Sequence, residues 1–260
     1  ILGAALIAGY LCAWMFERLP WRSLGLTLHQ GWLRDLLIGS AIGFAALALA
    51  VGIATVPGGL KFSFGSGEAL FAAWKSLLSS LVLFLVAALA EEAAFRGYGL
   101  QTLMRAKLTW LGVFLTSVPF GLVHLQNPNV VPVVTITNTI IAGVWLSVAY
   151  LRTRSLWCPL GVHFGWNWAL GWFFGLPVSG LRLVSNPLLL GEDAGPNWLT
   201  GGSYGIEGGV AATVALVAFT LFVWRTRWLS ATPELLKLTS EENPATPAAV
   251  VSIRTNENNA

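Results

Sequence analysis

The sequence predicts an all-α fold, a polytopic transmembrane helical bundle with about seven to eight spans. Of its 260 residues, 55% are hydrophobic and only 10% are charged. Apolar runs of about 20 residues recur along the chain, which is the length a helix needs to cross a hydrocarbon core of ~30 Å. This balance excludes the ordinary soluble globular classes.

Seven apolar segments are expected to be the membrane-spanning helices. They are residues 1–16, 36–56, 77–104, 108–127, 130–151, 156–176 and 207–224. The stretch before the third of them, residues 68–80, is more amphipathic, so we expect it to lie in the membrane interface before the chain turns inward. Because the chain starts at Ile1 inside an apolar run and without Met, we also expect its native N-terminus to lie upstream.

The basic residues predict the orientation of the bundle. If the seven segments alternate in direction, most Lys and Arg of the loops fall on one side, whereas Lys61 and Arg182 fall on the other. The positive-inside rule makes the basic side cytoplasmic. We therefore expect an integral protein of a bacterial inner membrane with its C-terminus in the cytoplasm. The basic side carries Arg18, Arg22, Arg34, Arg105, Lys107, Arg152, Arg154, Arg225 and Arg227.

The bundle is expected to comprise residues 1–230. Within it, residues 177–209 are rich in Gly, Pro, Asn and Ser and predict a long outer loop, either a cap over a cavity or, as we favour, a plain connector. Residues 231–260 are rich in Thr, Pro, Glu and Asn and predict a disordered cytoplasmic tail. The net charge of +3 is spread over the loops, so the lipid bilayer is an expected partner and nucleic acid is not.

Three charged residues interrupt the third apolar segment. Glu91, Glu92 and Arg96 lie within six positions, although each ionised side chain at bilayer depth costs about 2.5–3.5 kcal/mol. Glu92 and Arg96 are four positions apart, so we expect an ion pair on one helix face. Glu91 lies about 100° round the helix without a partner in its segment. An unpaired carboxylate in an apolar site suits a general base, while the alternative is a helix end where the charges meet water.

Two of the three histidines lie in later apolar segments. His124 ends one such stretch, and His163 lies four positions before Asn167, so this second pair shares a helix face. One buried histidine is usually a hydrogen-bonded core residue, but ionisable groups within a membrane tend to face one another. We therefore expect these side chains to meet near Glu91. His29 is expected to be an ordinary residue of a cytoplasmic loop, and no role is assigned to it.

Three motifs thus occur in order, each within an apolar segment: Glu-Glu-x-x-x-Arg (Glu91, Glu92, Arg96), Phe-x-x-x-His (Phe120, His124) and His-x-x-x-Asn (His163, Asn167). This set resembles the CPBP family of intramembrane proteases, which includes type II CAAX prenyl endopeptidases and bacteriocin-processing and abortive-infection proteins. The resemblance covers about residues 84–171, the expected protease-like core. The eight spans usual for its prenyl proteases leave room for one more helix before Ile1.

The resemblance implies peptide-bond hydrolysis within or at the membrane, with a peptide or membrane protein as substrate. It implies a catalytic set of Glu91, Glu92, His124, His163 and Asn167. Glu91 with His124 would hold and deprotonate the attacking water. His163 and Asn167 would stabilise the tetrahedral oxyanion. Whether the substrate is prenylated is left open.

The resemblance also leaves two mechanisms open. If a metal ion takes part, its implied ligands are Glu91, His124 and His163, and zinc is the metal expected for a Glu/His set with an open position. In the metal-free alternative the carboxylate alone activates the water. Arg96 would in both cases hold Glu92 as a structural ion pair.

Two other classes of function stay open on the sequence alone. A catalytically idle membrane scaffold or immunity factor would keep the same fold and the same motifs without turning over a substrate. A transporter would account for the buried charges, because ionisable groups within membrane helices often mark ion or proton pathways.

Overall fold

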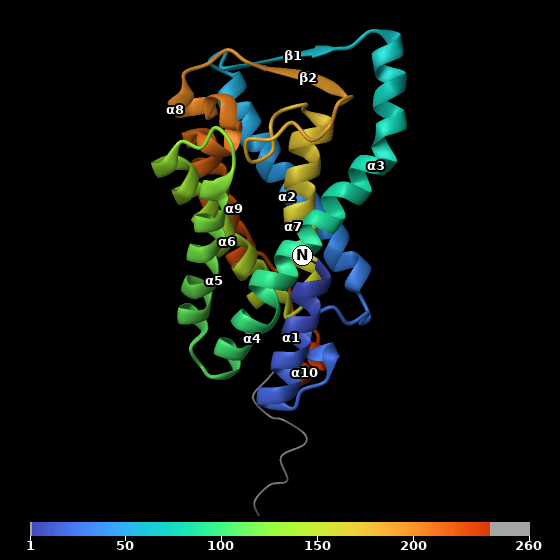
Figure 1. Ribbon diagram of the computed structural model, residues 1–260, viewed down its shortest axis with the longest axis vertical. Coiled ribbons are helices and arrows are strands. Elements are labelled where there is room, and N and C mark those ends of the chain that lie inside the picture. The colour runs from blue at the N-terminus through green and yellow to red at the C-terminus, as the bar shows by residue number, and fades with distance from the viewer. Residues whose placement is uncertain (1, 240–260) are drawn as a thin grey trace, which may run out of the picture.

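The computed structural model describes residues 2–239, and helices form almost all of the bundle (Figure 1). Each apolar segment expected to be helical contains a helix. In chain order the helices are α1 (Leu2–Glu17), α2 (Trp32–Thr55), α3 (Gly67–Glu92), α4 (Tyr98–Arg105), α5 (Thr109–Val123), α6 (Pro132–Thr153), α7 (Trp157–Trp168), α8 (Asn197–Thr200), α9 (Val210–Arg225) and α10 (Pro233–Thr239).

Three helical segments within residues 2–239 are long and apolar enough to cross a membrane. They are Trp32–Thr55, Gly67–Arg105 and Pro132–Thr153, whereas α1 and α9 are apolar but shorter. This arrangement fits the expected class, a helical membrane bundle. The number of seven to eight crossings stays a prediction.

One element departs from the all-α prediction. Strands β1 (Leu60–Phe64) and β2 (Leu189–Asp193) pair antiparallel, with Leu60 opposite Asp193 and Phe64 opposite Leu189. The pair crosses one end of the bundle between the α2–α3 connection and residues 177–209 (Figure 1). Backbone groups of connecting segments need hydrogen-bond partners, and here each connector supplies them to the other. A pairing between strands so far apart in the chain leaves no local sequence signal.

Glycines bring α2 and α7 into backbone contact. On α2 these are Gly39 and Gly43, and on α7 they are Gly161 and Gly165. A Cβ atom at any of the four would lie closer than 3.0 Å to a backbone oxygen of the other helix. Only glycine permits this approach, as in the small-residue contacts between membrane helices. The contact fixes α7, the helix that carries His163 and Asn167, against α2.

The third apolar segment belongs to one long helical unit. Helix α3 runs without a break from Gly67 to Glu92, so residues 68–80 are continuous with the helix that follows, and their place in the membrane interface stays a prediction. A π-helical turn, Ala93–Gly97, follows directly and leads into α4. A second π-helical turn, Ala169–Phe173, follows α7. Such π-helical turns are rare in proteins, and those that occur are often found at functional sites.

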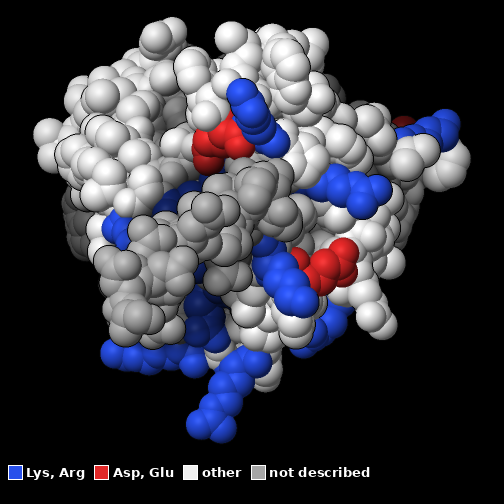
Figure 2. All heavy atoms as spheres, turned by 90° about the horizontal axis from the view of Figure 1, so that it is seen from below, with Lys and Arg blue, Asp and Glu red and all other residues white. Residues whose placement is uncertain are grey.

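The loops that carry most of the basic residues meet at the end opposite the β1–β2 pair. Arg34 donates to the carbonyl of Trp228, and Arg152 donates to the carbonyls of Thr226 and Leu229. Figure 2 looks at this end and shows Lys and Arg spread around it. These loops lie at one end of the bundle, which agrees with the assumption that successive apolar segments alternate in direction. That this end faces the cytoplasm stays a prediction.

Two expectations at this end need correction. Pro233–Thr239 forms helix α10, with Leu235 buried, so the disorder expected from residue 231 onward is wrong for this part. Residues 240–260 lie outside the described residues. His29 is not an ordinary loop residue: it is 3% exposed, and its Nε2 lies 3.1 Å from Ser155 Oγ and 3.6 Å from Asp35 Oδ2.

Candidate active site

A cavity of about 550 Å³ lies in the middle of the bundle. Its walls come from α3, α5, α6, α7, α9 and residues 177–209, and most of the side chains that line it are apolar. Four of the five residues expected to be catalytic line this cavity. They are Glu91 from α3, His124 from the end of α5, and His163 and Asn167 from α7.

The fifth residue, Glu92, lies behind the cavity wall and holds His163. Its Oε1 accepts from Arg96 at 3.0 Å and from His163 Nδ1 at 2.9 Å. Glu92 and Arg96 are both fully buried, so the expected ion pair is present and shielded from water. Arg96 also donates to the carbonyl of Gly143 on α6. A carboxylate only accepts hydrogen bonds, so Nδ1 of His163 carries a proton, and Nε2 is the nitrogen left for another partner.

Glu91 lies on the other side of the same imidazole. Its Oε2 is 3.8 Å from His163 Nε2, just beyond direct hydrogen-bond range. The Glu91 side chain is 37% exposed and borders the cavity, whereas Glu92 has no exposed surface. Oε2 of Glu91 is itself buried and has no hydrogen-bond partner in the described structure. Two adjacent glutamates thus have different surroundings, one paired and sealed and the other open to the cavity.

His124 is held through its own helix. Its Nδ1 lies 2.6 Å from the carbonyl oxygen of Phe120, one turn earlier at the end of α5. Because a carbonyl accepts, this contact puts a proton on Nδ1 and leaves Nε2 as the second functional nitrogen. Helix α5 ends at Val123 and a 3₁₀ turn, His124–Gln126, begins at the histidine itself. His124 therefore lies at a helix end and is half-buried.

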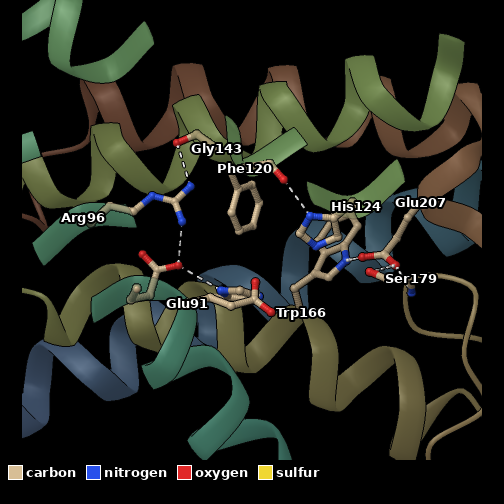
Figure 3. Close-up of polar contacts among 10 residues, drawn as sticks. Glu91, Arg96, Phe120, His124, Gly143, Trp166, Ser179 and Glu207 are labelled. Carbon is tan, nitrogen blue, oxygen red and sulfur yellow. Dashed lines mark hydrogen bonds and ion pairs between the residues drawn. The ribbon is translucent and has the colours of Figure 1, made fainter. Parts of the chain in front are cut away.

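Phe120 lies between Arg96 and His124, as Figure 3 shows. The Arg96 guanidinium carbon is 4.3 Å from the centre of the Phe120 ring, a cation–π distance. The same ring is 4.8 Å from the His124 ring and 6.1 Å from the His163 ring, centre to centre. The Phe120 ring therefore contacts all three groups, with Arg96 and the two histidines packed around it.

Residues 72–169 match the family model of Rce1-like type II CAAX prenyl endopeptidases. That segment carries the site. The match contains Glu91, Glu92, Arg96, His124 and His163 together with Asn167, and it confirms the family resemblance seen in the motifs. A family of this kind implies a protease that acts on peptides in a membrane setting.

One curated relative matches part of the chain. An uncharacterized 24.3 kDa protein of Escherichia coli is 33% identical over 102 residues. The aligned part is 38% of this chain and 45% of the relative, so the chain spans less than half of the relative's length. No solved structure matches the chain.

The metal-binding set implied by the resemblance is not assembled in the geometry described. Nowhere in residues 2–239 do three His, Cys, Asp or Glu side chains lie close enough together to hold a metal ion. Glu91 and His163 lie close to each other, whereas the orientation of the His124 ring is set by its hydrogen bond to the Phe120 carbonyl. As arranged in residues 2–239, these side chains do not form a three-ligand site for zinc, and a bound zinc ion stays a prediction.

Residues 177–209, here called the cap, contribute to the site and are more than the plain connector we favoured. Val178, Ser179, Leu181 and Leu183 line the cavity, and so does Glu207 near the end of the cap. No motif pointed to them. The available signal was Glu207 itself, an acidic residue directly before an apolar span and among glycines.

Proposed function

We propose that this chain is an intramembrane endopeptidase that hydrolyses peptide bonds of membrane-associated or lipid-modified substrates through a water activated by Glu91. One observation carries the proposal. The Glu91 side chain is 37% exposed at the wall of a cavity large enough for a peptide segment, and its carboxylate lies 3.8 Å from the Nε2 atom of His163. The proposal needs no metal ion, and every step below uses residues of this chain.

We place the attacking water on the cavity side of Glu91, against the carboxylate oxygen that is not buried, because Oε2 of Glu91 has no exposed surface. Nε2 of His163, which lies beside the same carboxylate, is assigned as the second contact of this water. Glu91 takes one proton from this water as its oxygen attacks the carbonyl carbon of the substrate. His163 holds the oxygen from its Nε2 side, and Glu92 and Arg96 fix the ring from behind.

The attack produces a tetrahedral intermediate with a negative oxygen. The amide of Asn167 lines the cavity one helix turn after His163 and is the donor we assign to that oxygen. His124, on the opposite wall, is assigned to the same region of the substrate. As the C–N bond breaks, Glu91 gives its proton to the departing amine. The oxygen of the water stays on the carbonyl carbon and becomes part of the new carboxyl group. Water, peptide bond and proton are then balanced.

The surrounding context belongs to the same proposal. A bundle with its basic end in the cytoplasm of a bacterial inner membrane would place the cap on the outer side. The cavity would then lie between the two surfaces, within reach of a membrane-associated peptide. The apolar walls of the cavity suit either an apolar peptide segment or the lipid group of a modified substrate.

The test compares Glu91→Gln with the wild type in proteoliposomes, using a library of membrane-anchored peptides and mass spectrometry of the products. Glutamine keeps the shape of the side chain but cannot accept the proton. We expect hydrolysis to fall by about 10²–10⁴-fold, the range for loss of a general base. Glu192→Gln is the matched control, because it makes the same change at an exposed position of the cap.

Equal turnover by Glu91→Gln and wild type would overturn the proposal. Absence of any cleavage by the wild type, together with full complementation of a deletion phenotype by Glu91→Gln, would favour the catalytically idle scaffold. Proton-dependent uptake of a solute in the same proteoliposomes would favour a transporter.

A further inference from the structure

Glu207 carries a partly buried set of hydrogen bonds that the proposed reaction does not use. Its Oε1 accepts from the indole nitrogen of Trp166 on α7 at 3.0 Å. Its Oε2 accepts from the backbone nitrogen of Ser179 at 2.5 Å and from the Ser179 hydroxyl at 3.2 Å. Figure 3 shows the carboxylate between these two residues. One side chain thus binds two elements that are remote in sequence.

These bonds join the two ends of the cap. Ser179 lies near the start of the cap and Glu207 near its end, 28 positions later. The backbone at the end of the cap is held separately, because Asn138 on α6 donates to the carbonyl oxygens of Glu207 and Gly209. The start of the cap is tied to this anchored end by the Glu207 carboxylate and by a backbone bond from Gly180 to the carbonyl oxygen of Tyr204, and the Glu207 carboxylate also ties it, through Trp166, to α7.

The third partner connects the cap to the site. Trp166 immediately precedes Asn167, is 5% exposed and packs edge-on against Trp145 at 6.0 Å between ring centres. Trp145, Trp166 and Asn167 all line the cavity, as do Val178 and Ser179 of the cap. A shift of the cap away from Trp166 would therefore change the wall of the cavity beside Asn167.

We propose that Glu207 is a positioning residue: its carboxylate latches the cap to α7 and so sets the cap side of the substrate cavity. A carboxylate is suited to this, because all three of its partners are donors and it accepts from each. Glutamine in its place would turn one acceptor into an NH₂ group facing a donor. The link to substrate binding depends on the protease function proposed above, whereas the latch itself does not.

The latch can be tested without a substrate by limited trypsin digestion in nanodiscs. Arg182 is exposed and provides the basic residue within the cap, and cleavage after it yields a fragment that begins at Leu183. Digestion of a folded segment follows how often it opens. We expect Glu207→Gln to raise the rate of this cleavage about 10-fold or more, as for loss of a hydrogen bond to a charged group. Glu192→Gln should leave the rate unchanged.

Trp166→Phe removes the same bond from the other side and keeps an aromatic ring in the core. It should also speed cleavage after Arg182, and the double variant with Glu207→Gln should be less than additive, because both changes remove one shared bond. Cleavage of Glu207→Gln at the wild-type rate, or fully additive effects in the double variant, would overturn the latch. Trp166→Phe also decides the question if Glu207→Gln fails to fold.

The second readout is peptide hydrolysis. The cap forms part of the cavity wall and contacts no reacting atom. Glu207→Gln should therefore weaken substrate binding, raising KM several-fold, and leave kcat within about 3-fold of the wild-type value. A fall in kcat at constant KM would contradict the positioning role. If the wild type hydrolyses nothing while Glu207→Gln still opens the cap to trypsin, the protease function fails and the latch stands.

Discussion

His163 and His29 are both buried beside carboxylates, and a comparison of the two shows what distinguishes a site from a core cluster. His163 is 8% exposed and lies 2.9 Å from Glu92 and 3.8 Å from Glu91. His29 is 3% exposed and lies 3.6 Å from Asp35. By residue type, proximity and burial the two histidines look alike.

The difference lies in how the ring nitrogens are used and in what they face. The nitrogens of His163 have separate partners: Nδ1 binds the sealed Glu92, and Nε2 faces the open Glu91 at the cavity. At His29, Nδ1 lies 3.0 Å from the carbonyl of Gln30, and Nε2 alone faces both Ser155 and Asp35. A nucleophilic triad needs the serine and the acid on opposite nitrogens. Ser155 is also fully buried, so the His29 cluster is structural.

The largest expected effect tests this contrast by removing each histidine. His163→Ala takes away the Nε2 side of the proposed water site and should lower peptide hydrolysis by about 10²–10⁴-fold. His29→Ala should leave hydrolysis per folded molecule unchanged and lower thermal stability. Hydrolysis is measured in proteoliposomes and normalised to the fraction that elutes as a folded monodisperse species.

The result that would remove the distinction is a comparable loss of turnover in both variants. It would mean that the two clusters are coupled through α7, which begins beside Ser155 and carries His163. A loss in His29→Ala alone would place the chemistry at the wrong end of the bundle.

The next effect concerns the support behind His163. Arg96→Ala leaves Glu92 buried without its cation, and breaking a buried ion pair from one side typically costs about 3–5 kcal/mol. We therefore expect a marked fall in melting temperature in detergent, together with loss of hydrolysis. Arg96→Lys is the control: it keeps the charge but lacks the planar fork that reaches both Glu92 and the Gly143 carbonyl, so its loss should be smaller. An unchanged melting temperature for Arg96→Ala would show that His163 alone satisfies Glu92.

The sequence was sufficient for contacts that are local or that follow from helix spacing. The apolar runs predicted where the helices lie, and the spacing of four predicted the Glu92–Arg96 pair. Because ionisable groups within a membrane tend to face one another, we expected His124, His163 and Asn167 to meet near Glu91, and all four residues line one cavity. Their roles stay predictions, since no finding tests them.

Contacts between distant segments could not be read in this way. Glu92 binds His163 71 positions away, and His29 lies beside Ser155 126 positions away, so neither partner is implied by local spacing. The cap was underestimated for the same reason, because the bonds of Glu207 depend on the folded chain. One signal was present in the sequence and missed. Glycines four positions apart, at 39 and 43 and at 161 and 165, mark faces of α2 and α7 that can pack closely.

The smallest expected effect sharpens the account of the His29 cluster. Ser155→Ala removes the hydroxyl that lies 3.1 Å from His29 Nε2 and accepts from the Trp157 backbone nitrogen at the start of α7. Loss of a buried hydroxyl and its bonds should cost about 1–3 kcal/mol, visible as a small fall in melting temperature. Hydrolysis should stay at the wild-type level, because the change lies at the opposite end of α7 from Asn167. Loss of activity with no change in melting temperature would mean that Ser155 acts chemically, and the division of the molecule into one reactive and one structural histidine would then be wrong.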